Sequence, residues 1–310
     1  MSAPTDTVRD MAAEPPSGAP AAAAKTRPFY WSVRRELWEN RSIYIAPAVV
    51  AGVVLFGFVV GAGRLPGRMR HLEAFDLAKQ AHLAALPFAL SAFAILATGF
   101  LVGVFYCLGA LHGERRDRSI LFWKSLPVSD LTTVLAKASI PMLVMPIVVF
   151  AVVVATHLVM LLLGGAVLAA NGVGADVLWG HWPFFHMSVM LLYTLFVLAL
   201  WHAPIWAWLL LVSAWAKRVT FLWAVAPPFA LCVFEKIAFD TSYVGQSLKD
   251  RFAGGIAAGF TDAPGRHVVF DLMQPDPLGF VLNPGLWGGL AVAAGFLAGA
   301  VWLRRNREPI

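Results

Sequence analysis

The sequence predicts an all-α, polytopic membrane protein with about six transmembrane helices. Of its 310 residues, 59% are hydrophobic and only 14% are charged, whereas an average soluble domain carries about 25% charged residues. A globule of this size has too much surface to hide so many apolar side chains. The apolar residues gather in long runs, and helices are the expected form because an open sheet leaves backbone groups unsatisfied in lipid.

Six runs have the length that a membrane span requires, which is about 20 residues for a bilayer core of about 30 Å. They cover about residues 43–63, 86–111, 139–164, 186–216, 219–238 and 285–303. The fourth run is long enough that it must tilt, kink or protrude, and Pro204 offers a kink. The fifth contains Pro227 and Pro228 and ends at Glu235, which we expect to pair with Lys236 or to lie in the interface.

The distribution of Lys and Arg predicts the orientation of these helices. Sixteen lie in the N-terminal region, the segments after the second and fourth runs, and the C-terminus, and eight lie in the other three segments. Because cytoplasmic segments are enriched in Lys and Arg, both termini are expected in the cytoplasm. The segment 239–284 then faces outward, and its apolar stretch 252–260 is too short to span, so it lies at the interface or re-enters.

The chain before the first run divides into two parts. Residues 1–24 are rich in Ala, Pro and Ser and lack the apolar core of a signal peptide, so they are expected to form a disordered cytoplasmic tail. Residues 25–42 combine apolar positions at helical spacing with Trp31 and Trp38, which favours an elbow helix lying in the cytoplasmic interface. The alternative is an ordinary aromatic and basic flank of the first span.

The segment 112–138, HGERRDRSILFWKSLPVSDLTTVLAKA, is too long and too patterned for a simple turn between two spans. A charged cluster, 114–118, precedes a short apolar helix candidate that Pro127 ends. Ser129 is placed to cap a second helix, which leads into the third span. Two short helices hinged at a proline form a surface suited to docking another protein.

This segment resembles the corresponding region of the type 2 ATP-binding-cassette transporter permeases. The resemblance rests on Glu114-Arg115 followed by Ser119, on Leu126-Pro127-Val128-Ser129, and on Lys137. It extends to the six-helix layout, the elbow helix and the cytoplasmic termini, and so covers most of the transmembrane region 43–305 and the elbow before it. The sequence departs from the family pattern at Arg118, where glycine is usual, and at Ala136, where glycine often precedes the lysine.

The resemblance implies a membrane-spanning permease subunit of an ATP-driven exporter in the cytoplasmic (inner) membrane of a bacterium. In the family, this segment couples the permease to the ATPase subunit. The residues to which the resemblance assigns that role are Glu114, Arg115, Arg116, Asp117, Ser119, Leu126, Pro127 and Ser129. The alternative is that the charges only enforce topology.

No G-x-x-x-x-G-K-[ST] motif occurs in the sequence, so ATP and Mg²⁺ are expected on a separate ATPase subunit, and no cofactor is expected on this chain. A second permease copy or homologue completes the expected assembly, whose other partner is membrane lipid and not nucleic acid.

Other candidate residues lie within the apolar runs. His202, Pro204 and Trp206 sit in the middle of the fourth run and are candidates for a substrate pathway, because ionisable residues inside a membrane are often functional. The alternative for His202, as for His157 and His186, is a hydrogen-bonded histidine in the core or at the interface. Three G-x-x-x-G pairs, at 57 and 61, 99 and 103, and 295 and 299, permit close helix packing within the chain or across a dimer seam.

Two other classes of membrane protein predict different sequence features. A secondary, ion-coupled transporter would show inverted repeats and charged residues at mid-membrane, and the sequence offers no convincing repeat. A membrane enzyme would need a nucleophile, a metal site or paired carboxylates near one interface, and no such set can be assembled from the sequence. Cys107 and Cys232 lie in apolar runs without metal-ligand spacing.

Overall fold

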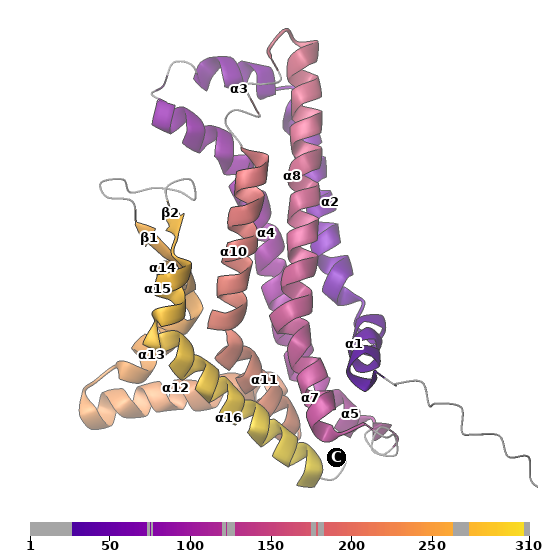
Figure 1. Cartoon of the computed structure of the whole chain (residues 1–310), viewed down its shortest axis with the longest axis vertical. Helices are drawn as coiled ribbons and strands as arrows, with labels where there is room; N and C mark the ends of the chain where they lie inside the picture. Colours follow the sequence, from indigo (N-terminus) through magenta and orange to yellow (C-terminus); the bar gives the residue numbers. More distant parts are fainter. Residues whose placement is uncertain are drawn as a thin grey trace, which may run out of the picture.

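The structure, a computed structural model, is an elongated bundle of helices (Figure 1). It describes residues 27–72, 77–119, 128–174, 183–262 and 273–306, with Phe75, Phe122 and Leu178. Within this part of the chain, six helices are long and apolar enough to cross a membrane, which makes the protein a multi-pass membrane protein by the length and composition of its helices.

The first half of the chain forms the long axis of the bundle. Its helices are α1 (Pro28–Glu39), α2 (Ser42–Ala62), α3 (Leu65–Leu72), α4 (Leu77–Ala110), α5 (His112–Arg116), α7 (Asp130–Ser139) and α8 (Met145–Ala170). A π-helical turn, η1 (Ile140–Val144), joins α7 to α8 without a break, giving a continuous helix of 41 residues. Pro141 lies in this turn, and its missing N–H group is accommodated by the wider hydrogen-bond spacing.

The second half returns along the bundle and then turns across it. Its elements are α10 (Phe184–Trp201), α11 (Ala203–Trp215), α12 (Thr220–Phe239), α13 (Tyr243–Ala253), α14 (Gly255–Gly259), β1 (Phe260–Asp262), β2 (Met273–Pro275), α15 (Pro277–Leu282) and α16 (Pro284–Asn306). The strands β1 and β2 pair antiparallel, with Thr261 opposite Gln274. This short hairpin is an addition to the expected all-α class.

The predicted spans agree with the structure in number but differ in extent. The second is longer than expected, because α4 begins at Leu77, and the third begins at Asp130 rather than near residue 139. The fourth is divided at His202 into α10 and α11. The division confirms the kink expected there, because Pro204 cannot donate a backbone hydrogen bond to the preceding turn.

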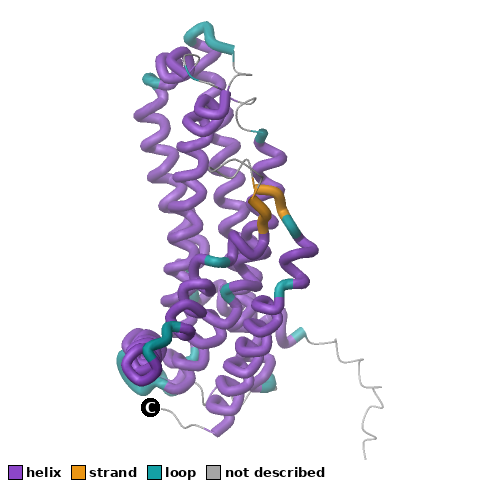
Figure 2. The backbone as a smooth tube through the Cα atoms, turned by 90° about the vertical axis from the view of Figure 1, so that its left-hand side faces the viewer, coloured by secondary structure: helices purple, strands orange, loops and turns teal. Residues whose placement is uncertain are grey.

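The fifth predicted span is helical but lies differently from the others. Helix α12 runs across the long axis of the bundle, whereas α2 and α8 follow it (Figures 1 and 2). Only 11% of its most apolar window is buried. Glu235 does not pair with Lys236: it accepts hydrogen bonds from the Tyr243 and Val244 amides at the start of α13, while Lys236 binds Asp240 at 2.6 Å.

The segment between α12 and α16 folds back onto the bundle. Gly255 and Gly259 of α14 lie against α10, where an added Cβ would meet Trp201 at 3.2 Å and Val197 at 2.8 Å. Arg251 of α13 stacks over the Trp201 ring, 4.5 Å from its centre. The stretch 252–260 therefore packs against α10.

Candidate functional site

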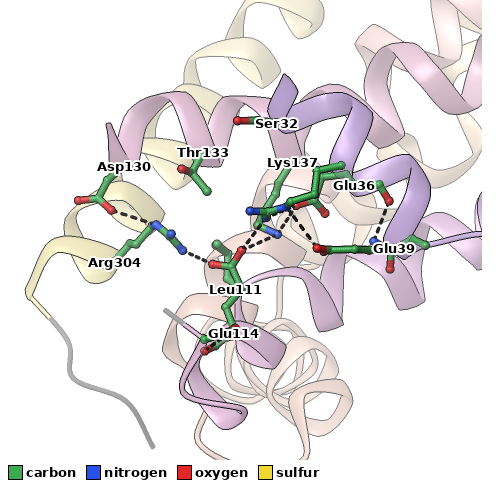
Figure 3. A network of polar contacts seen from close by, with 12 residues as sticks. Ser32, Glu36, Glu39, Leu111, Glu114, Asp130, Thr133, Lys137 and Arg304 are labelled. Carbon is green, nitrogen blue, oxygen red and sulfur yellow. Dashed lines mark hydrogen bonds and ion pairs between the residues drawn. The ribbon is translucent and has the colours of Figure 1, made fainter. Parts of the chain in front are cut away.

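A cluster of charged and polar side chains is buried at one end of the bundle, where α1, α4, α5, α7 and α16 meet (Figure 3). We call it the polar cluster, and its members are Arg35, Glu36, Tyr106, Glu114, Asp130, Lys137 and Arg304. The C-terminal end of α16 and helix α1 both lie at this end of the molecule (Figure 1). The cluster therefore joins the two ends of the described chain to the segment between the second and third spans.

Glu36 is the acceptor on the α1 side of the polar cluster. Its side chain is only 2% exposed and receives three donors: Lys137 Nζ at 2.7 Å, Arg35 Nη2 at 2.9 Å and the Tyr106 hydroxyl at 2.9 Å. Burial acts to lower the pKa of the Arg35 guanidinium, but the neighbouring Glu36, Glu39 and Glu114 raise that pKa above its ordinary value. A buried carboxylate is tolerated here because its oxygens are satisfied by cations and a hydroxyl.

Glu114 is the acceptor on the α5 side. Its Oε1 atom lies 3.1 Å from Lys137 Nζ and 3.2 Å from Arg35 Nη2, and its Oε2 atom accepts a hydrogen bond from Arg304 Nη1. Lys137 thus bridges Glu36 and Glu114, so α1 and α5 are connected through α7. Such charge-assisted hydrogen bonds are stronger than neutral ones.

Arg304 connects the last helix to the same cluster. It is 3% exposed, and its Nε atom donates to Asp130 Oδ1 at 2.9 Å. The three cations Arg35, Lys137 and Arg304 balance the three carboxylates of Glu36, Glu114 and Asp130, so the interior of this end carries no net charge from these six groups.

The sequence next to each residue explains how the side chains of the polar cluster on α7 and α1 come to face one another. Ser129 caps α7 by accepting a hydrogen bond from the Thr132 amide at 3.1 Å, as its position before the helix predicts. Asp130 and Lys137 are seven residues apart on α7 and so share one face. On α1, Val33 and Leu37 pack against the largest apolar core cluster and thereby turn Glu36 inward.

A second set of hydrogen bonds fixes α5 to the end of α11. Ser213, which is fully buried, accepts hydrogen bonds from the Leu111 and His112 amides and donates one to the Leu108 carbonyl. Arg115 is 4% exposed and donates to the Ala214 carbonyl at 2.7 Å. These contacts satisfy the backbone groups that a helix leaves unpaired where α4 ends.

The residues predicted to couple to an ATPase fall into four groups. Glu114 and Arg115 are buried in the contacts just described, while Arg116 and Asp117 are exposed and pair with each other at 3.0 Å. Ser119 donates to the Glu114 carbonyl over 3.4 Å, and Ser129 caps α7. Leu126 and Pro127 lie outside the described residues.

Arg118 adopts a left-handed backbone conformation, with φ of 55°. An L-residue with a side chain is disfavoured in this region, whereas glycine is not. Glycine would adopt this conformation at position 118 without the steric cost that Arg118 bears.

The three pathway candidates are packed inside the chain. His202 Nδ1 lies 2.8 Å from the Leu198 carbonyl oxygen, and its ring packs edge-on against Phe100. Trp206 is 5% exposed and belongs to the core cluster, and Pro204 is buried. His157 is likewise buried and lies 3.0 Å from both Ser91 Oγ and the Phe88 carbonyl oxygen, whereas His186 is exposed.

Several members of the polar cluster were not among the residues predicted from sequence to form a site. Glu36, Tyr106 and Arg304 come from three separate segments: the helix before the first span, the second span itself and the basic flank of the last span. The only local signal is helical spacing on α1, because Glu36 lies three residues after Val33 and one before Leu37 and so falls near the apolar face. Tyr106 and Arg304 carry no such signal in the sequence.

No protein family model, curated protein or solved structure matches the chain. Among the described residues, no group of three or more His, Cys, Asp or Glu side chains is placed to hold a metal ion. The site is therefore defined by its own chemistry: a buried, charge-balanced cluster that holds α1, α5, α7 and α16 together beside an exposed charged pair.

Proposed function

We propose that the chain is the membrane-spanning permease subunit of an ATP-binding-cassette exporter, driven by a separate ATPase subunit that binds ATP and Mg²⁺. The observation that carries the proposal is the polar cluster, to which Glu114, Asp130 and Lys137 of the segment 112–138 contribute. An energy-coupling segment must contact a partner on its outer side and be fixed to the spans on its inner side. Arg116 and Asp117 are exposed for the first task, and Glu114 and Arg115 are anchored for the second.

The anchoring supports transmission of movement over the whole bundle. A force on α5 acts on α11 through Arg115 and Ser213, on α16 through Arg304, and on α1 and α7 through Lys137. Packed elements linked by ion pairs move as units rather than deforming continuously. The alternative of an ion-coupled carrier would favour charged groups at mid-span, whereas this cluster lies at one end of the bundle (Figures 1 and 3).

A second permease copy or homologue belongs to the same proposal, because the family that the sequence resembles uses two nucleotide sites together. The same proposal includes three further points. This end of the bundle faces the cytoplasm, α1 lies in the membrane interface, and the protein is located in a bacterial inner membrane. The excess of Lys and Arg at this end supports that orientation.

The experiment exchanges the exposed charges of the coupling segment. The first step is to search the genes next to the one for this chain for a P-loop ATPase and to co-express the two proteins, and the absence of such a gene would weaken the proposal. The variant then carries Arg116→Asp with Asp117→Arg. We expect co-purification and coupled ATP turnover to fall at least about tenfold, because charge complementarity across an interface is reversed. The thermal unfolding of the isolated chain should be unchanged, since both side chains are exposed.

The matched control exchanges a second exposed ion pair, Lys236 and Asp240, which lie 2.6 Å apart at the end of α12. This variant should retain the complex and its turnover. Full assembly and turnover in the 116 and 117 variant, or an equal loss in the control, would reject the proposed docking surface.

A further inference from the structure

Helix α1 has two chemically different faces. Glu36 points inward and is held by the polar cluster, and Val33 and Leu37 pack against the core. On the opposite side of the helix, Arg27, Trp31, Arg34 and Trp38 follow one another at intervals of four, three and four residues. That spacing places all four on one face, roughly 170° from Glu36 at about 100° per residue. We call these four residues the α1 stripe.

Arginine and tryptophan are stacked along the α1 stripe. The Arg34 guanidinium lies over both tryptophan rings, 5.1 Å from the centre of Trp31 and 4.5 Å from the centre of Trp38. The two rings are 55% and 62% exposed. Stacking on aromatic faces orients the planar guanidinium and leaves its edge N–H groups available to a bidentate acceptor such as a phosphate.

The position of α1 fixes the surroundings of the stripe. The apolar span α2 begins at Ser42, three residues after α1 ends at Glu39, so the stripe lies close to the level at which that span leaves the bilayer core. Tyr30 extends the exposed aromatic surface at the start of the helix, because its ring lies edge-on to that of Trp31 with the ring centres 5.4 Å apart. Tryptophan and tyrosine favour the headgroup region of a membrane, and arginine there meets lipid phosphates.

We propose that the α1 stripe is a binding site for the phosphate of an anionic phospholipid, with Arg34 as the central ligand and Arg27 as a second cation. An acidic protein segment fits less well, because the three exposed aromatic side chains Tyr30, Trp31 and Trp38 beside a membrane span match a headgroup and its acyl boundary. The inference does not depend on an ATPase partner, since the site lies wholly on this chain.

The test measures phospholipid binding to the purified full chain in detergent by native mass spectrometry. Short-chain phosphatidylglycerol is titrated against phosphatidylcholine. The wild-type chain should bind phosphatidylglycerol at least about fivefold more tightly. Arg34→Gln should remove that preference, and Trp31→Ala with Trp38→Ala should weaken it. Arg34→Lys should restore part of it, because it keeps the charge but loses the planar fork.

Arg68→Gln is the control, because Arg68 is also exposed but lies on α3 at the opposite end of the bundle (Figure 1). It should leave the preference unchanged, and each variant must melt at the wild-type temperature. The proposal is overturned if Arg34→Gln retains the preference, or if Arg68→Gln loses it equally. It is also overturned if inorganic phosphate at the same concentration displaces the lipid fully, or if Arg34→Gln affects only co-purification of a protein partner.

Discussion

At the scale of single residues, the polar cluster depends on complete pairing. Lys137 and Arg304 are each about as buried as the core aliphatic side chains, yet each contacts two carboxylates. A buried charge without a partner costs several kcal/mol, whereas a fully paired set is tolerated. Because the charges of the polar cluster balance, the loss of any one charged member leaves a buried charge with fewer partners and should destabilise the cluster.

Replacing Arg304 by methionine tests this dependence. The Arg304→Met variant leaves Glu114 and Asp130 each without one cation, and we expect the free energy of unfolding to fall by about 3–5 kcal/mol. The measurement is chemical unfolding in mixed detergent micelles. Arg305→Met is the control, because Arg305 is the exposed neighbour on the same turn and should change stability little. Equal stability of the two variants would show that the cluster does not hold α16.

At the scale of elements, helix contacts distinguish the glycine pair on α4 from the pair on α2. An added Cβ at Gly99 would lie 2.6 Å from Val149 Cγ2, and one at Gly103 would lie 3.1 Å from Trp206. The pair on α4 therefore permits close approach to α8 and α11. An added Cβ at Gly57 or Gly61 would have no atom of the described residues within 4 Å, so the pair on α2 makes no close helix contact within that part of the chain.

Alanine substitutions separate these cases. Gly99→Ala should lower the free energy of unfolding by about 1–3 kcal/mol, because the new methyl group overpacks the contact with Val149. Gly57→Ala should be neutral or stabilising by up to about 1 kcal/mol, since alanine favours the helix and the added methyl group meets nothing within the chain. Unfolding in the same micelles gives both values. A loss at Gly57 as large as that at Gly99 would mean that α2 packs more closely than described.

At the scale of the whole molecule, the bundle has two distinct ends. Helix α5, the start of α7 and the end of α16 lie at one end, and α3 and the end of α8 lie at the other (Figure 1). With the continuous helix of 41 residues between them, residues at the two ends should face opposite sides of a membrane.

Cysteine labelling tests this arrangement. Single cysteines are introduced as Asp117→Cys and Asn171→Cys, both at exposed positions, after Cys107 and Cys232 have been replaced by alanine. A membrane-impermeant maleimide applied outside intact cells should label position 171 and not position 117, and opened membranes should give labelling at both. Labelling of both positions from outside would exclude a span between α5 and the end of α8.

The composition, the lengths of the apolar runs and the N-cap at Ser129 are local properties of the chain. They were sufficient to predict a helical membrane protein with six long helices, a break near Pro204 and a helix beginning at residue 130. Each follows from hydropathy or from backbone chemistry within a few residues, so no knowledge of the tertiary structure was needed.

The polar cluster is different, because most of its contacts join distant parts of the chain, such as Glu36 with Tyr106, 70 positions apart, and Glu114 with Arg304, 190 positions apart. Sequence spacing does not show which cation meets which carboxylate. Nor could it show that α12 lies across the bundle, since an apolar helix has the same composition in either orientation. The apolar pattern of the sequence determined that the chain is a membrane bundle, and only tertiary packing decided which charges are buried together at its end, because that depends on which helix faces meet.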